Sequence, residues 1–332
     1  MLRRLFACWL IPIVLLAPPA LANCIGQDML PEFRAEDPTG LDGMFAKAHA
    51  IPNSKGLFWK IEKPGAPASY LFGTFHANEV VDQVPDAVWA ALDQARIALF
   101  ELSPEEQEAM DARIRSDVHF TIDVNARPLL DDLSEGQRAV LTEAMQIRGI
   151  PVEAANQMRP WLLASLLGFP ACHLKAAAAG VEVLDNVMAD RAAQNGIPVE
   201  GLETYEDALE GFSEFDRDML IKVMVADDSL LKREEDVFRT NALLYSAGET
   251  AAINELSIWL TERLDVDFDA RAVNQALMVN LLDGRNRKWM APLTKQLLRG
   301  NAFIGVGALH LPGQAGLIEL LRNEGFIVTR LD

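Results

Sequence analysis

The sequence predicts an α/β protein whose parallel or mixed sheet is formed by two strand–helix–strand repeats, one near each end of the chain. Runs of β-branched, aromatic and aliphatic residues occur within residues 57–102 and again within 302–331, and each group encloses a helix-like segment near a proline. The residues between the two groups, about 104–300, have helical spacing almost throughout. We therefore expect a large helical insertion within the α/β domain.

The N-terminal repeat begins with two paired strands. Residues 57–61 and 69–75 have strand-type patterns, and the Pro- and Gly-rich residues 63–67 between them are typical of a turn. A helix with apolar residues at helical spacing follows Pro85, and residues 97–102 form a short strand of buried type. The order strand, helix, strand predicts a parallel pair with a right-handed crossover.

The C-terminal repeat has the same order of elements. Residues 302–306 form the predicted strand, Pro312 begins a helix that ends at Gly325, and residues 326–331 form the last strand. Between the two repeats the predicted elements are helices at 134–148, 181–195, 205–264 with breaks, and 270–299 with a break near Gly284, and a short strand at 198–202.

The first residues are typical of a cleaved signal peptide. Arg3 and Arg4 give a basic start, and residues 5–16 are apolar but too few to span a bilayer. The sequence Ala20-Leu21-Ala22 is typical of a cleavage site. We therefore expect residues 1–22 to be removed during export.

The mature domain is then residues 23–332, in the periplasm or secreted, with its start near Asn23. Lipidation at Cys24 is the alternative, but Asn23 is not the small residue that lipidation requires before the cysteine.

The charge of the chain makes some partners poor candidates. Asp and Glu outnumber Lys and Arg by 48 to 30, giving a net charge of −18, and removal of residues 1–22 takes away two arginines and no acids. Nucleic acid and anionic membrane are therefore poor partners. No later run of about 18 uncharged apolar residues occurs, so we expect no membrane span in the mature domain. The sequence does not indicate an oligomeric state.

Two of the three cysteines, Cys24 and Cys172, remain in the mature chain. Because export brings them into a compartment that permits oxidation, we expect a disulfide between them. By the chain-entropy model, a loop of that length is stabilised by about 4 to 5 kcal/mol. The alternative is two buried free thiols.

Two of the five histidines lie in the same local pattern, in Gly73-Thr74-Phe75-His76 and in Gly307-Ala308-Leu309-His310. Both patterns end a predicted strand of the sheet. Ligands of open α/β sheets bind at the carboxyl ends of strands, where glycine lets the backbone turn sharply or approach a ligand. The other histidines, which lack such a pattern and are expected at the surface or in packing, are His49, His119 and His173.

Glu101 ends the predicted strand that should lie beside the strand bearing His76. An acid at that position is costly unless it is paired, hydrogen-bonded or coordinating. Two imidazoles and a carboxylate can hold a divalent metal ion such as Zn, Mn or Co with a position open for water, and the ion lowers the pKa of that water. The alternative is that His76 and His310 only cap strand ends by bonding backbone groups.

Two weaker candidates lie in the insertion. Glu203 follows a predicted strand and is a candidate second catalytic acid, although an acid there also suits the start of a helix. Arg287 is a candidate clamp for a carboxylate or an oxyanion, and a solvated helix face is its alternative. Neither His-Glu-x-x-His nor Gly-x-Ser-x-Gly occurs, which argues against a common zincin or serine hydrolase.

Together these motifs resemble the TraB/GumN family and the related Tiki proteins, over nearly the whole mature chain. The family's Gly-x-x-His pair maps on His76 and His310, and its invariant acid maps on Glu101. The resemblance implies a fold similar to the erythromycin esterase and ChaN group and, for the Tiki branch, a metal-dependent peptidase activity. Other matching segments are Cys24-Ile25-Gly26, Arg159-Pro160-Trp161, Gly201-Leu202-Glu203-Thr204 and Arg285-Asn286-Arg287, in which Asn286-Arg287 matches the family's Arg-Asn type pair.

Two functional hypotheses follow. The first is an exported metal-dependent hydrolase, metalloprotease-like, in which His76, His310 and Glu101 hold the ion and Arg287 stabilises the oxyanion. Its substrate would be a peptide or another small molecule of the envelope. The second is a non-catalytic envelope protein that binds a metal, an iron-chelate or a glycan in the same cleft.

Overall fold

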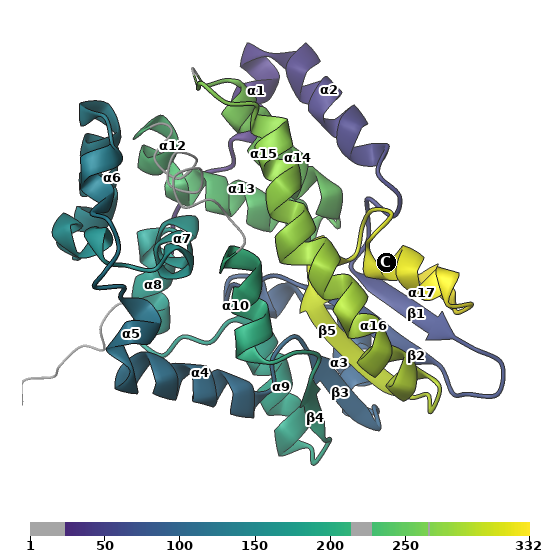
Figure 1. Cartoon of the computed structure of the whole chain (residues 1–332). Coiled ribbons are helices and arrows are strands. Elements are labelled where there is room, and N and C mark those ends of the chain that lie inside the picture. The colour runs from purple at the N-terminus through teal and green to yellow at the C-terminus, as the bar shows by residue number, and fades with distance from the viewer. Residues whose placement is uncertain (1–23, 214–227, 265) are drawn as a thin grey trace, which may run out of the picture.

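A six-stranded mixed sheet forms the centre of the computed structural model, which describes residues 24–213, 228–264 and 266–332 (Figure 1). The predicted signal peptide, residues 1–22, lies outside these ranges. The order across the sheet is β4, β3, β5, β2, β1, β6. The strands are β1 (Phe58–Glu62), β2 (Ser69–Thr74), β3 (Ile97–Phe100), β4 (Val199–Gly201), β5 (Ala302–Gly307) and β6 (Ile327–Arg330).

Strands β1 and β2 form the hairpin that the local pattern predicts. They pair antiparallel, with Phe58 opposite Phe72 and Ile61 opposite Ser69, and β6 pairs antiparallel with the other edge of β1. The turn that joins them contains Gly65 at a φ of 88°, in the left-handed region that favours glycine. The paired strands and the turn of the N-terminal repeat are therefore confirmed.

Strand β5 lies between β2 and β3 and pairs parallel with both. The prediction that β2 and β3 are direct neighbours was therefore wrong. All six residues of β5 are buried, so the strand is most stable in the middle of the sheet, covered on both faces and both edges. Gly305 makes room there for an aromatic ring, because a Cβ atom at this position would lie 2.6 Å from Cε1 of Phe100.

Helices cover both faces of the sheet (Figure 1). On one face, alternate strand residues such as Phe72, Phe100 and Phe303 pack against α2, α9, α13 and α14. On the other face, Leu71 and Ile304 pack against α16 and α17. The bounds of these helices, and of α1 and α3, which pack on α2 and α9, are α1 (Leu30–Glu36), α2 (Pro38–His49), α3 (Asp86–Asp93), α9 (Leu184–Gln194), α13 (Glu234–Ser246), α14 (Thr250–Glu262), α16 (Gly284–Leu297) and α17 (Leu317–Asn323).

The predicted helical insertion runs from β3 to β5, and β4 is the one short strand among its described residues. Part of it has a separate small core, formed by Leu129, Leu141, Met145 and Leu163 among others. The remaining helices are α4 (Pro104–Ser116), α5 (Val118–Thr121), α6 (Glu135–Ile147), α7 (Pro160–Gly168), α8 (Ala171–Ala178), α10 (Tyr205–Ser213), α12 (Asp228–Lys232) and α15 (Ala270–Met278).

The start of the last helix differs from the sequence prediction. Helix α17 begins at Leu317 rather than at Pro312, because Gly313 has a φ of 94° and its N–H bonds the carbonyl of Pro52, which keeps this segment out of a helix. The break expected near Gly284 is a π-helical turn, Val279–Asp283, that joins α15 to α16.

No single helix in the described ranges is long and apolar enough to cross a bilayer. Helices α7 and α8 meet the length and composition criteria only as a pair, and a bend of 104° separates them.

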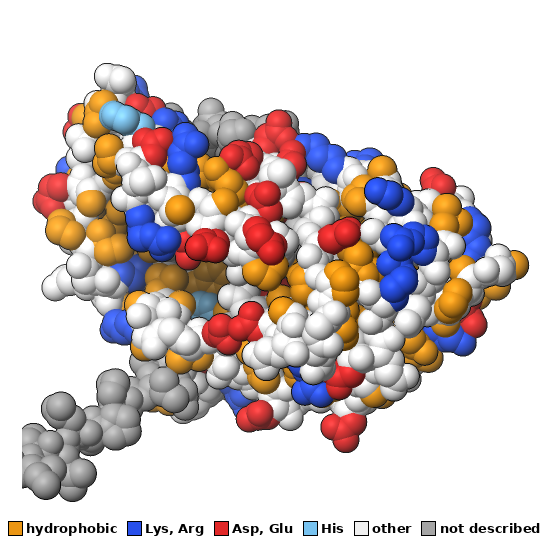
Figure 2. Space-filling view, turned by 90° about the horizontal axis from the view of Figure 1, so that it is seen from below, with side chains coloured by type: hydrophobic (Ala, Val, Ile, Leu, Met, Phe, Trp, Pro, Cys, Tyr) orange, Lys and Arg blue, Asp and Glu red, His pale blue; other side chains and the backbone are white. Residues whose placement is uncertain are grey.

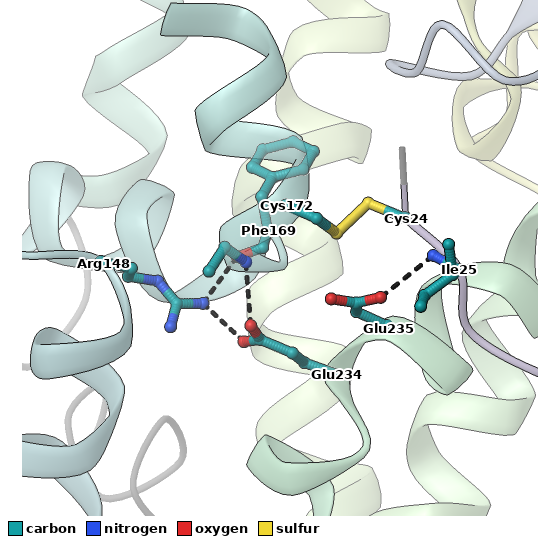
Figure 3. Close-up of a disulfide and its surroundings, with 8 residues drawn as sticks. Cys24, Ile25, Arg148, Phe169, Cys172, Glu234 and Glu235 are labelled. Atoms are coloured by element: carbon teal, nitrogen blue, oxygen red, sulfur yellow. Dashed lines mark hydrogen bonds and ion pairs between the residues drawn. A yellow bond between two sulfur atoms is a disulfide. The ribbon is translucent and has the colours of Figure 1, made fainter. Parts of the chain in front are cut away.

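The expected disulfide between Cys24 and Cys172 is present (Figure 3). It attaches the first described residues to α8. The same segment is held on α13, where the backbone N–H groups of Ile25 and Gln27 donate to Glu235 and Asp236. The N-terminal segment therefore links two helices of the insertion: the disulfide attaches it to α8, and the hydrogen bonds attach it to α13.

Removing this disulfide is expected to destabilise the protein. The double variant Cys24→Ala/Cys172→Ala should lose about 2 to 5 kcal/mol of unfolding free energy, because its unfolded chain is no longer cross-linked. Denaturant titration measures this loss, and reductant should lower the stability of the unsubstituted protein alone. Alkylation of both cysteines without reductant would show that the bond does not form.

Candidate functional site

Three predicted site residues converge on one point beside Gly307, at the carboxyl ends of β2, β3 and β5. A Cβ atom built on Gly307 would lie 3.2 Å from Oε1 of Glu101, 3.4 Å from Nε2 of His76 and 3.6 Å from Cδ2 of His310. Gly307 has a φ of −51°, which any residue adopts. Glycine is therefore needed here for space rather than for backbone conformation.

Gly73 serves a different purpose in the other Gly-x-x-His segment. A Cβ atom there would lie 2.7 Å from Cδ1 of Leu311 and 3.1 Å from Cα of Ala308. The absence of a side chain thus lets the segment that follows β5 lie directly against the end of β2.

Glu101 lies one residue beyond β3, and both its carboxylate oxygens are hydrogen-bonded. Oε1 accepts from the backbone N–H of Gly307 at 2.7 Å, and Oε2 accepts from Nη2 of Arg285 at 2.6 Å. Burial acts to raise the pKa of Glu101, but the Arg285 guanidinium, the His76 imidazole and the hydrogen bond from Gly307 act in the other direction, and the pKa lies below its usual value. Glu101 is therefore ionised.

His310 is almost fully buried, and its ring is oriented by Asn286. Nδ1 of His310 lies 2.6 Å from Oδ1 of Asn286, whose Nδ2 donates to the carbonyl of Ala315 at 2.9 Å. The amide orientation makes Nδ1 the protonated nitrogen and leaves the lone pair on Nε2, 3.7 Å from Oε1 of Glu101. Burial lowers the pKa of His310 to about 3, so the ring is neutral.

His76 is in a different environment, because its side chain is 48% exposed. Its Nδ1 lies 2.9 Å from Oδ2 of Asp185, in the first turn of α9, and the hydroxyl of Thr74 donates to the other oxygen of Asp185. The charge of Asp185 raises the pKa of His76 to about 9. Asp185 thus fixes the ring so that Nε2 faces Gly307.

The arginine of the cluster is Arg285, not the predicted Arg287. Arg285 bonds Glu101 and also donates from Nε to Oε1 of Glu203 at 2.9 Å, whereas Arg287 lies on the exposed face of α16. Two residues along an α-helix are separated by about 200° around its axis, so the two arginines point to opposite sides. Asn286, also predicted, does reach the site.

Glu203 is 2% exposed and lies behind the cluster rather than at the shared point. It accepts from Nε1 of Trp289 at 2.9 Å as well as from Arg285. Burial raises its pKa against the opposing effect of Arg285. These contacts indicate that Glu203 holds Arg285 in place, and the second-acid role predicted for Glu203 has no support from its position.

The donors of the cluster suit a divalent metal ion in kind and orientation. Each histidine has Nδ1 beside an oxygen acceptor, as outer partners orient metal-ligating histidines. Nε2 of His76 lies toward the point beside Gly307, and Nε2 of His310 lies 3.7 Å from Oε1 of Glu101. Across the ranges that the structure describes, however, no three His, Cys, Asp or Glu side chains are grouped closely enough to hold an ion. Metal ligation by His76, His310 and Glu101 thus stays a prediction.

Exchanging Arg285 and Arg287 for glutamine in turn should give very different stabilities. Arg285→Gln leaves two acids, Glu101 and Glu203, without their cationic partner and should cost about 3 to 5 kcal/mol of unfolding free energy. Arg287→Gln, the matched control on the exposed face, should change it by no more than about 0.5 kcal/mol. Denaturant titration measures both, and equal effects would contradict the assignment of Arg285 to the cluster.

Comparison with known proteins supports the resemblance seen in the motifs. No curated protein sequence matches the chain. The sequence profile of the TraB/PrgY/gumN family matches residues 57–330, which include both Gly-x-x-His segments, Glu101 and the helix that carries Arg285. The chain therefore belongs to the TraB/PrgY/gumN family.

Proposed function

We propose that the chain is an exported, metal-dependent hydrolase that cleaves peptides or another small substrate of the envelope. The observation that carries this proposal is the convergence of His76, His310 and Glu101 on the point beside Gly307. The disulfide is consistent with export, because such bonds persist in oxidising compartments.

In this proposal Nε2 of His76, Nε2 of His310 and Oε1 of Glu101 would hold the ion. A bound divalent ion lowers the pKa of a water ligand and polarises a carbonyl group. His310 and Glu101 are already in the protonation states that ligands need, since His310 is neutral and Glu101 is ionised. Asn286 and Asp185 hold the two rings in place.

The low pKa of Glu101 makes this residue a poor general base, since a base works best when its pKa is near the pH of the reaction. Its role is therefore to place negative charge beside Gly307. Arg285 maintains that charge, and in the described residues its hydrogen bonds go to Glu101, Glu203 and the carbonyl of Leu281. Arg285 is thus a positioning residue for Glu101.

Replacing either histidine of the pair is expected to abolish metal binding and peptide cleavage. His76→Ala and His310→Ala each remove one of three donors, whereas His119→Ala, at an exposed position outside the cluster, is the matched control. Elemental analysis of the purified protein and cleavage of a peptide library, with and without chelator, measure the two properties. Metal binding without cleavage would favour a non-catalytic binding protein, and equal results for all three variants would contradict the site.

Gly307→Ala should block the site without disturbing the backbone. The added methyl group would occupy the point on which the three side chains converge, so metal affinity or cleavage should fall by about 100-fold. Circular dichroism and thermal unfolding should remain close to those of Gly136→Ala, a control position with no heavy atom within 4 Å of the added carbon. Unchanged cleavage by Gly307→Ala would place the reaction elsewhere.

A further inference from the structure

A cavity of about 330 Å³ lies in the helical insertion beside α13. Its walls come from the link between α7 and α8 and from α12, α13 and α14. Most of the lining residues are apolar, and they include Leu167, Phe169, Val237, Phe238 and Leu260. A cavity of this size and composition is within the range of small-ligand pockets.

The charged residue that lines this cavity, Glu234, is already fully paired (Figure 3). Its Oε1 accepts from the backbone N–H of Ala171 at 2.8 Å, and its Oε2 accepts from Nη2 of Arg148 at 2.7 Å. Arg148 also donates to the carbonyl of Phe169 at 2.7 Å. The described lining of the cavity therefore offers no free charge to a ligand, which favours an uncharged, apolar occupant.

Aromatic rings connect the cavity to the candidate site. Phe238 lines the cavity, and its ring centroid is 5.7 Å from that of Phe75, the residue directly before His76. Phe75 lies 5.2 Å from Tyr245, whose hydroxyl donates to the carbonyl of Gly73 at 2.8 Å. A chain of aromatic contacts thus leads from the cavity lining to the first Gly-x-x-His segment.

The surface is hollowed on the face shown in Figure 2, and hydrophobic side chains with a histidine among them gather in the hollow. We propose that the cavity is the specificity pocket of the hydrolase: it takes a large apolar side chain of a peptide whose scissile bond lies at the cluster beside Gly307. This inference rests on the proposed function.

Asn241, also at the cavity wall, has an Oδ1 atom without a hydrogen-bond partner in the described residues. A peptide N–H group would supply the missing donor.

Binding of a neutral apolar dye, N-phenyl-1-naphthylamine, tests the cavity independently of catalysis. Leu260→Trp fills the interior of the cavity. Ser257→Trp blocks an exposed part of its lining, where a large side chain does not disturb the core. Each variant should weaken dye binding on the order of tenfold or more. The matched control is Leu298→Trp, at a position that is 55% exposed and outside the lining. His310→Ala should bind the dye like the unsubstituted protein.

Cleavage of a peptide library then tests the link to the site. The unsubstituted protein should prefer a large apolar residue near the scissile bond, and Leu260→Trp and Ser257→Trp should lose that preference while Leu298→Trp keeps it. Dye binding that is absent, or equal in all three tryptophan variants, overturns the inference, as does cleavage without apolar preference. If no peptide is cleaved although the dye binds, the proposed function fails, and the specificity role of the cavity fails with it.

Discussion

The carboxylate of Glu101 connects the parts of the molecule that build the site. One oxygen accepts from Gly307 at the end of β5, and the other accepts from Arg285 on α16. A largely buried acid at the end of an apolar strand is unfavourable without such partners. Because Arg285 must reach Glu101, α16 docks with this side toward the sheet, and the next residue, Asn286, is then placed to orient His310.

The two histidines have the same sequence pattern but different environments. His310 is buried beside Trp289, with ring centroids 4.4 Å apart, and burial keeps it neutral. His76 is half-exposed and paired with Asp185, which favours its protonated form. The buried histidine is thus ready to donate a lone pair, whereas the exposed one must first lose a proton to do so.

Local patterns predicted the strands, the hairpin turn, helix α6 and the histidine pair with Glu101, because each depends on residues close together in sequence. The place of β5 between β2 and β3 depends on contacts across the whole chain, which periodicity does not encode. Asp185 lies 109 residues from His76, and in the sequence it is simply an acid near the start of a predicted helix, with nothing to link it to that histidine. Arg285 and Arg287 are the same residue type, two positions apart in one helix, and only the orientation of α16 on the sheet distinguishes them.

The central strand β5 also determines when the site can exist during synthesis. It is the fifth of six strands along the chain, yet it alone joins β2 to β3 in the described sheet. A growing polypeptide that has not reached residues 302–310 therefore lacks His310, Gly307 and the strand that brings His76 near Glu101. If the protein cleaves peptides as proposed, the nascent chain is inactive toward itself and its surroundings until it is almost complete, and a prematurely ended chain lacks the reaction centre altogether.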